Sequence, residues 1–116
     1  MSELVTTETI VEFFEKSVQQ KRVVDSHTWI DGAQKLNALL GGEHDVLFQL
    51  QQKVAKMRVE LLSGGAKVGY AKMVVDSSDE YREMQTQKAK IGRIEEMIRI
   101  AKLQARLKDS EMRGYQ

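Results

Sequence analysis

Two stretches of this sequence repeat apolar residues at alternating intervals of three and four positions. This spacing returns each residue to the same side of an α-helix, so it predicts helices with one apolar stripe each. The first stripe predicts a helix over about 43–62 and consists of Leu47, Leu50, Val54, Met57 and Leu61. The second predicts a long helix over about 77–112 and consists of Ile91, Ile94, Ile98, Ala101 and Ala105. We expect both stripes to form a core or oligomer seam.

The chain contains no proline in 116 residues, where a globular chain of this length ordinarily has about five. Few turns are therefore forced on the backbone, and long helices follow. The sequence predicts a single all-α domain, a helical bundle or hairpin with a long C-terminal helix. With 41% hydrophobic residues the core is small, which favours burial of further apolar surface against other copies.

The long C-terminal helix carries a second apolar edge made of Ile100, Leu103 and Leu107. At about 100° per residue this edge lies on a different side from the Ile91 stripe, so one partner helix cannot cover both. Either the N-terminal helices cover it or another subunit does. The seam residues therefore predict a homo-oligomer as well as a core.

The first 42 residues predict two shorter helices. An acidic helix, within residues 1–25, should start near Thr6 to Thr9 with a capping box from Thr9 to Glu12, and run toward Arg22. A break near Asp25 should precede a helix from Thr28 to Leu40 that Gly41 and Gly42 stop. Its expected buried side is Trp29, Leu36, Leu39 and Leu40.

The stretch "SGGAKVGYAKM", residues 63–73, has the glycine spacing of a phosphate-binding loop. Tyr70 and Ala71 stand where that loop needs its lysine and hydroxyl, and no strand precedes it. We therefore expect residues 63–76 to be a glycine-containing hinge, in which Gly64 and Gly65 end the preceding helix and Val68 to Val75 form a short turn or helix.

No set of residues in the sequence predicts catalysis. The chain has no cysteine, and its two histidines, His27 and His44, lack the spacing of a helical metal pair. Glu95 and Glu96 are adjacent and so point in different directions on a helix, and Glu95 is the expected partner of Arg99. We expect a protein that is not an enzyme and that binds no metal or cofactor.

The N-terminus carries glutamates where a signal peptide has basic residues, and no apolar run approaches the roughly 20 residues of a membrane helix. With no cysteine to form disulfides, a cytoplasmic location and no membrane partner are expected.

Charge is distributed unevenly along the chain. Residues 1–15 hold four Glu and no basic residue, about −4, whereas residues 86–108 hold seven basic residues and two Glu, about +5. Such an asymmetry indicates an anionic partner for the basic part. The alternative is the charged flank of a coiled coil. The nucleic-acid-binding candidates are Lys53, Lys56, Arg58, Lys67, Lys72, Lys88, Arg99, Lys102 and Arg106, with Tyr70, Tyr81 and Tyr115 as candidates for base stacking.

The runs "WIDGAQKLNALLGGEHDVLFQLQQKVAKMRVELLSGG" and "DSSDEYREMQTQKAKIGRIEEMIRIAKLQARLKD" share a layout with a known family. A basic helix ends in a Ser-Gly loop, a short segment follows, and a long basic helix closes the chain. Over roughly residues 29–112 this resembles the UvsY-like recombination mediators of T-even-type phages. The resemblance implies an oligomer that binds single-stranded DNA and helps to load a RecA-like recombinase in place of single-strand-binding protein. It also implies DNA contacts at Lys56, Arg58, Lys67 and Lys72.

The expected function is therefore that of a non-enzymatic single-stranded DNA-binding accessory protein, encoded by a phage and acting in the cytoplasm of a bacterial host. The rival expectation is a phage or prophage assembly adaptor, or an inhibitor of a host defence complex. In that case the acidic residues Glu3, Glu8, Glu12 and Glu15 would form the working surface.

Overall fold

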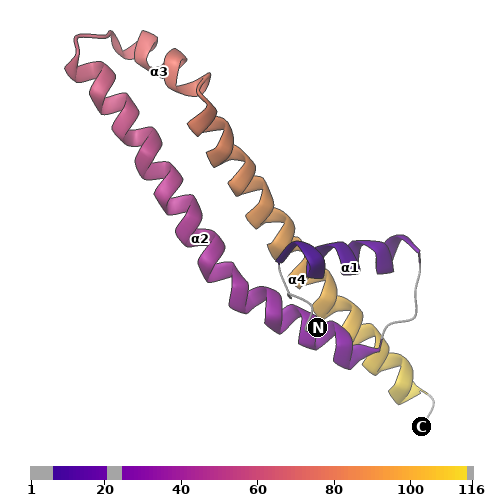
Figure 1. The fold of residues 1–116 in the computed structure, drawn as a ribbon. Helices are drawn as coiled ribbons and strands as arrows, with labels where there is room; N and C mark the ends of the chain where they lie inside the picture. Colours follow the sequence, from indigo (N-terminus) through magenta and orange to yellow (C-terminus); the bar gives the residue numbers. More distant parts are fainter. Residues whose placement is uncertain (1–6, 21–24, 115–116) are drawn as a thin grey trace. The chain divides into compact units, whose positions relative to one another are not determined.

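The computed structural model describes residues 7–20 and 25–114, and within these residues it contains helices and no strand. The all-α fold class is confirmed. The four helices are α1 (Thr7–Gln19), α2 (Ser26–Ser63), α3 (Val68–Asp76) and α4 (Asp79–Gly114) (Figure 1). The described residues form two compact units. Unit 1 contains α1, α2 up to Gly41 and α4 from Gly92 onward, and unit 2 is Gly42–Ile91.

Helix α2 runs without interruption through Gly41 and Gly42, so the prediction that these glycines stop a helix is wrong. Glycine in a helix costs about 1 kcal/mol relative to alanine but does not forbid the conformation. Here the segments on both sides of the glycines are held by burial, through Leu36 in unit 1 and Val54 in unit 2. The helix therefore continues through two residues of low helix propensity.

Helix α2 starts two residues before the predicted Thr28, because Asp25 caps it. The Thr28 backbone N–H donates to Asp25 Oδ1 at 2.7 Å, which satisfies one of the free donors of the first turn. The hydrogen bonds from Thr28 lower the pKa of Asp25 below its ordinary value.

Unit 1 is built around Phe14 of α1, which is fully buried. Its ring stacks on Trp29 of α2, with ring centroids 4.7 Å apart. Figure 1 shows α1 lying across α4 beside the start of α2, and Arg93 of α4 donates to Glu15 of α1 at 2.6 Å. Helix α1 therefore packs on the core of its own chain. The rest of that core is Val11, Ala33, Leu36, Ile94, Met97, Ile98, Ala101 and Ala105.

The boundaries of α1 and the buried side of α2 differ in part from the predictions. Helix α1 begins at Thr7, so Thr9 lies inside the first turn and the predicted capping box at Thr9 is wrong. The helix ends at Gln19, and the predicted extension to Arg22 reaches residues outside those described. On α2, the burial of Trp29 and Leu36 is confirmed, whereas Leu39 and Leu40 are half-buried.

Unit 2 depends on a chain reversal after Ser63. Gly65 has a positive φ of 95°, a conformation that costs little only in glycine. The Gly65 N–H donates to the Leu62 carbonyl at 3.1 Å and the Ala66 N–H donates to the Leu61 carbonyl at 3.0 Å. This pair of bonds is a Schellman motif, which satisfies the last carbonyls of α2. The short helix expected after the two glycines is present as α3.

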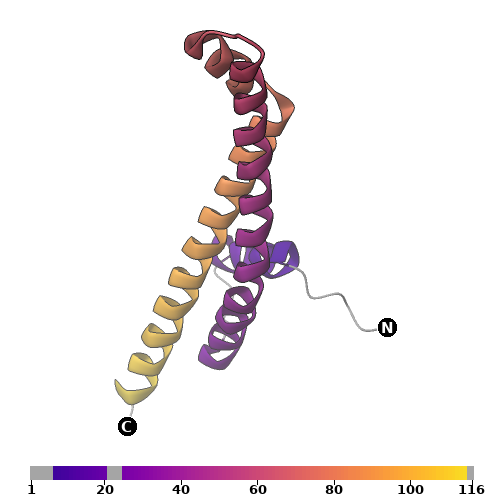
Figure 2. The same cartoon turned by 90° about the vertical axis from the view of Figure 1, so that its left-hand side faces the viewer.

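The reversal folds α3 back against the end of α2, as the second view shows (Figure 2). Val75 of α3 is completely buried with Val54 of α2 and Met84 of α4. The predicted first stripe packs around this cluster through Leu47, Leu50, Met57 and Leu61, so it is a core seam within one chain. The Glu43 carboxylate of α2 contacts α4 through two side chains. It accepts a hydrogen bond from the Gln87 amide at 2.7 Å and forms an ion pair with Lys90 at 3.0 Å.

The N-cap of helix α4 (Asp79–Gly114) lies one residue later than predicted. Ser78, not Ser77, accepts the Tyr81 backbone N–H, at 3.2 Å, while the Ser77 hydroxyl donates back to the Met73 carbonyl of α3 at 2.9 Å. The predicted second stripe, Ile91 to Ala105, is entirely buried and is confirmed as core. Of the second edge, Ile100 packs against the unit 1 core, whereas Leu103 and Leu107 are exposed.

The glycines of α2 generate a matched stability test. A Cβ at Gly32 would lie 2.0 Å from Cζ of Phe14, whose ring is buried and stacked, so Gly32→Ala should lower the melting temperature. A Cβ at Gly41 would meet nothing within 4 Å. Gly41→Ala should therefore stabilise the protein by about 1 kcal/mol, which corresponds to about 4–8 °C for a small domain.

The measurement is thermal unfolding followed by circular dichroism at 222 nm, a standard helix band, with the parent protein beside both variants. Equal melting temperatures for the two variants would contradict the close contact between Gly32 and Phe14.

Candidate nucleic-acid interface

The nine predicted nucleic-acid-binding residues fall in both units, and all nine are exposed. Unit 2 carries Lys53, Lys56 and Arg58 on α2, Lys67 in the turn, Lys72 on α3 and Lys88 on α4. Unit 1 carries Arg99, Lys102 and Arg106 on α4. The four candidates of the last helix, Lys88, Arg99, Lys102 and Arg106, which we call the basic row, are therefore divided between the two units.

Within that row, Arg99 is engaged by a carboxylate of its own helix. Its Nε donates to Glu96 at 3.1 Å, one turn earlier on α4, so the structure shows a pair with Glu96 where the sequence suggested Glu95. This hydrogen bond lowers the pKa of Glu96 and raises the pKa of Arg99. The pair offsets one positive charge of the row.

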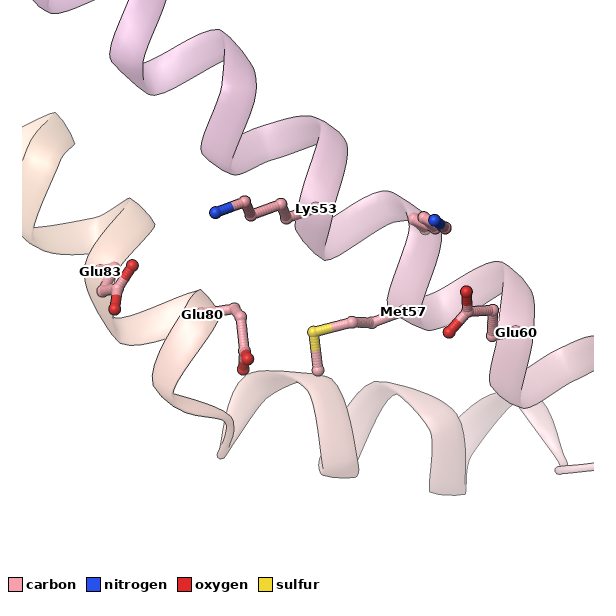
Figure 3. A pocket seen from close by; sticks show the side chains of 6 residues that line it. Lys53, Met57, Glu60, Glu80 and Glu83 are labelled. Atoms are coloured by element: carbon pink, nitrogen blue, oxygen red, sulfur yellow. The ribbon is translucent and has the colours of Figure 1, made fainter.

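Lys53 and Lys56 line an open hollow of about 400 Å³ between α2 and α4 in unit 2. Figure 3 shows Lys53 and Glu60 on α2, with Glu80 and Glu83 on the facing turns of α4. Three carboxylates thus share the hollow with two ammonium groups, a net charge of −1. A polyanion would meet repulsion here as well as attraction, so these two lysines are weaker candidates than their charge alone suggests.

The residues around the turn form a different environment. We call Arg58, Lys67, Tyr70 and Lys72 the turn surface. Among the described residues none of its three cations forms an ion pair, including Lys72 with Asp76 one turn further along α3. The cations are therefore available to an external anion.

The geometry of α3 explains why the turn surface faces outward. Ala71 and Val75 are the buried residues of this nine-residue helix, and they lie one turn apart on the side that meets unit 2. Tyr70 and Lys72 flank Ala71 in sequence, so they are rotated from it by about 100° in opposite directions and lie on the two exposed flanks of α3. Tyr70 is 57% exposed.

The three tyrosines proposed for base stacking are not equivalent. Tyr81 is half-buried against the unit 2 core, and its hydroxyl accepts from Gln85 at 2.6 Å. Tyr115 lies outside the described residues. Tyr70 is thus the tyrosine whose ring is open to a nucleic-acid base, and it lies on the same short segment as Lys67 and Lys72.

Sequence reasoning missed the exposed apolar side chains beside the turn surface. They are Val59, Leu62, Val68 and Met73. A signal was available, because the apolar residues of the stretch "VGYAKMVV" spread over more than one side of a helix, whereas one short helix against one neighbour can bury only one side. The missed property is that part of this surface can receive an apolar partner.

Other chemistry finds little support in the described part of the chain. It contains no group of three or more His, Cys, Asp or Glu residues that could hold a metal ion. His27 and His44 are exposed. Among the described helices none is long and apolar enough to cross a membrane.

The chain matches no model of a protein family, no curated protein and no solved structure. Its functional assignment therefore depends on its own residues and their arrangement.

The Glu96–Arg99 pair generates a pH prediction with a defined sign. Because the pKa of Glu96 is lowered in the folded protein, its stabilising contribution is present above the ordinary carboxyl range and is lost as the pH falls through the lowered pKa. Carbon-detected NMR of the Glu96 carboxyl should give a titration midpoint below the ordinary value for Glu, about 4.3. In Arg99→Ala that midpoint should move upward, and an unchanged midpoint would show that Arg99 does not engage Glu96 in solution.

Proposed function

We propose that this protein binds single-stranded nucleic acid through the turn surface and acts stoichiometrically rather than as an enzyme. The observation that carries the proposal is the exposed ring of Tyr70 on the same short segment as Lys67 and Lys72, two exposed cations that form no ion pair among the described residues. Cations neutralise backbone phosphates and release counterions, while an open aromatic ring stacks on an unpaired base. A duplex, whose bases are already stacked, gains only the first of these contributions.

The binding expected from one chain is weak. Three cations can contact only a few phosphates, and each contact weakens as salt rises. Several chains bound along one strand would add their contacts, because the second binding event then occurs at a high local concentration. A protein that works in this way coats or organises a strand instead of reading its sequence.

The biological role that fits this behaviour is that of a phage recombination mediator. The layout that resembles the UvsY-like family places basic residues around a Ser-Gly loop, at the positions of Lys56, Arg58, Lys67 and Lys72. Three of these four belong to the turn surface. In this proposal the protein holds single-stranded DNA while a RecA-like recombinase replaces single-strand-binding protein, inside the bacterial host.

A second candidate function, a protein adaptor or an inhibitor of a host complex, is favoured by the exposed apolar side chains next to the turn. The acidic version of that candidate is less well supported by the contacts of α1. Glu12 pairs with Lys16 at 2.9 Å and Glu15 pairs with Arg93 at 2.6 Å, while Glu3 lies outside the described residues. Carboxylates engaged within the chain make a poor imitation of a nucleic-acid backbone.

Two pairs of lysines test where nucleic acid binds. Lys67→Ala with Lys72→Ala should weaken binding to a labelled single-stranded oligonucleotide and reduce the salt dependence by about 1.4 in the log–log slope, about 0.7 for each lost phosphate contact. Lys53→Ala with Lys56→Ala removes the same charge from the hollow that Glu60, Glu80 and Glu83 share, so its effect should be smaller.

The measurement is fluorescence anisotropy at several salt concentrations, with duplex of the same sequence as a comparison. Equal losses in the two double variants would indicate a response to total charge alone. If the parent protein does not bind at low salt, the nucleic-acid proposal is wrong and the adaptor function becomes the better one.

Tyr70 tests the stacking contribution separately. Tyr70→Ala should cost about 1–3 kcal/mol, about 5- to 150-fold in affinity for single strands, with little change in the salt slope because no charge is lost. Tyr81→Phe is the matched control, since its ring is half-buried and loses only the hydrogen bond from Gln85. Parent-like affinity in Tyr70→Ala would mean that the ring does not contact the bases.

A further inference from the structure

Helix α2 has a second face in unit 2, separate from the seam that packs within the chain. Between Phe48 and Leu62, seven residues of α2 lie within about 60° of the direction of Ala55 at about 100° per residue. They are Phe48, Gln51, Gln52, Ala55, Arg58, Val59 and Leu62. All seven are exposed, and Phe48, Val59 and Leu62 keep 59%, 60% and 39% of their surface open. We call this the outer face of α2.

The outer face has the composition of a helix–helix contact. Phe48, Ala55 and Leu62 are spaced by seven residues, the repeat that keeps side chains along one line of contact between two helices. Arg58 is its only charged residue, and a small residue, Ala55, occupies its middle, where a neighbouring backbone can approach closely. Among the described residues no helix covers it, and the buried seam of α2 lies on another side.

The charge of the outer face restricts what can bind there. A phosphate backbone could pair with only one cation on this face and would gain nothing from Phe48 or Val59. An acidic helix could likewise form only one ion pair. A nearly neutral face of apolar and amide side chains matches another face of the same kind. A second copy of this chain supplies that match, and a two-fold interface uses the same surface on both partners.

We propose that two chains associate through the outer face of α2, with the two helices antiparallel and Ala55 on the two-fold axis. In this register Phe48 of one chain meets Leu62 of the other, and Gln52 meets Arg58. A parallel pair would instead set Arg58 directly against its own copy, which is unfavourable. The proposal does not require that the protein binds nucleic acid. In the dimer Arg58 belongs to the interface, and Lys67, Tyr70 and Lys72 remain the part of the turn surface that is open to nucleic acid.

Because the chain has no cysteine, single cysteines test this register directly. Phe48→Cys and Leu62→Cys should each form little disulfide-linked dimer alone, because equivalent residues lie about 21 Å apart at 1.5 Å per residue over 14 residues. An equimolar mixture of the two variants should give the linked heterodimer on a non-reducing gel. Gln49→Cys, exposed about 120° round the helix from Ala55, is the control for random cross-linking.

Three outcomes of this experiment would overturn the proposal. Dimers in each single variant, without the mixed product, would indicate a parallel pair. Equal cross-linking of Gln49→Cys would indicate random collision. The absence of any cross-linked product would indicate that the outer face is not an interface.

Sedimentation equilibrium gives an independent reading without cysteines. The parent protein should approach twice its chain mass of 13.2 kDa, whereas Ala55→Arg, which sets two like charges against each other at the axis, should sediment as a monomer with parent-like helix content. A parent protein that stays monomeric at the highest concentration of the run, or a dimeric Ala55→Arg, would contradict the proposed interface.

Discussion

The left-handed turn at Gly65 is the constraint on which the remaining structure depends. Without a reversal, the apolar seam of α2 would have no partner from its own chain in unit 2. The two Schellman hydrogen bonds from Gly65 and Ala66 end α2 where the chain reverses its direction. Val75 can therefore pack against Val54 and Met84. The same reversal brings α4 back to pack Ile94 with Trp29 and Phe14 in unit 1. The exposure of Lys67, Tyr70 and Lys72 follows from this turn as well.

The sequence predicted well those features that depend on periodicity within one helix. The stripe from Ile91 to Ala105 is buried, and the stripe from Leu47 to Leu61 packs half-buried around the buried Val54, because side chains three and four apart share a side of any helix. Features decided by neighbours were predicted less well. Gly41 and Gly42 predict a helix end when only their own propensity is considered, yet packing on both sides keeps α2 continuous. Between the adjacent serines, Ser78 caps α4 because Ser77 is already bonded to the end of α3.

The candidate site shows the same division. The type and order of its cations are visible in the sequence, but their surroundings are not, because Lys53 and Lys56 face Glu80 and Glu83 only after the chain reverses. The choice of Tyr70 over Tyr81 also depends on tertiary packing. The outer face of α2 was present in the sequence as the spacing of Phe48, Ala55 and Leu62, but the stronger seam on the same helix concealed it.

The way unit 1 is assembled has a consequence for the order of folding. Unit 2 is one continuous segment, and its contact between Glu43 and Gln87 closes a separation of 44 residues. Unit 1 combines segments from before and after unit 2, and its contact between Glu15 and Arg93 closes 78 residues. Because longer loops cost more entropy to close, unit 2 has the easier start. During synthesis, Phe14 and Trp29 can stack on each other early, but the unit 1 core is complete only when Ile94 and its neighbours on α4 have left the ribosome.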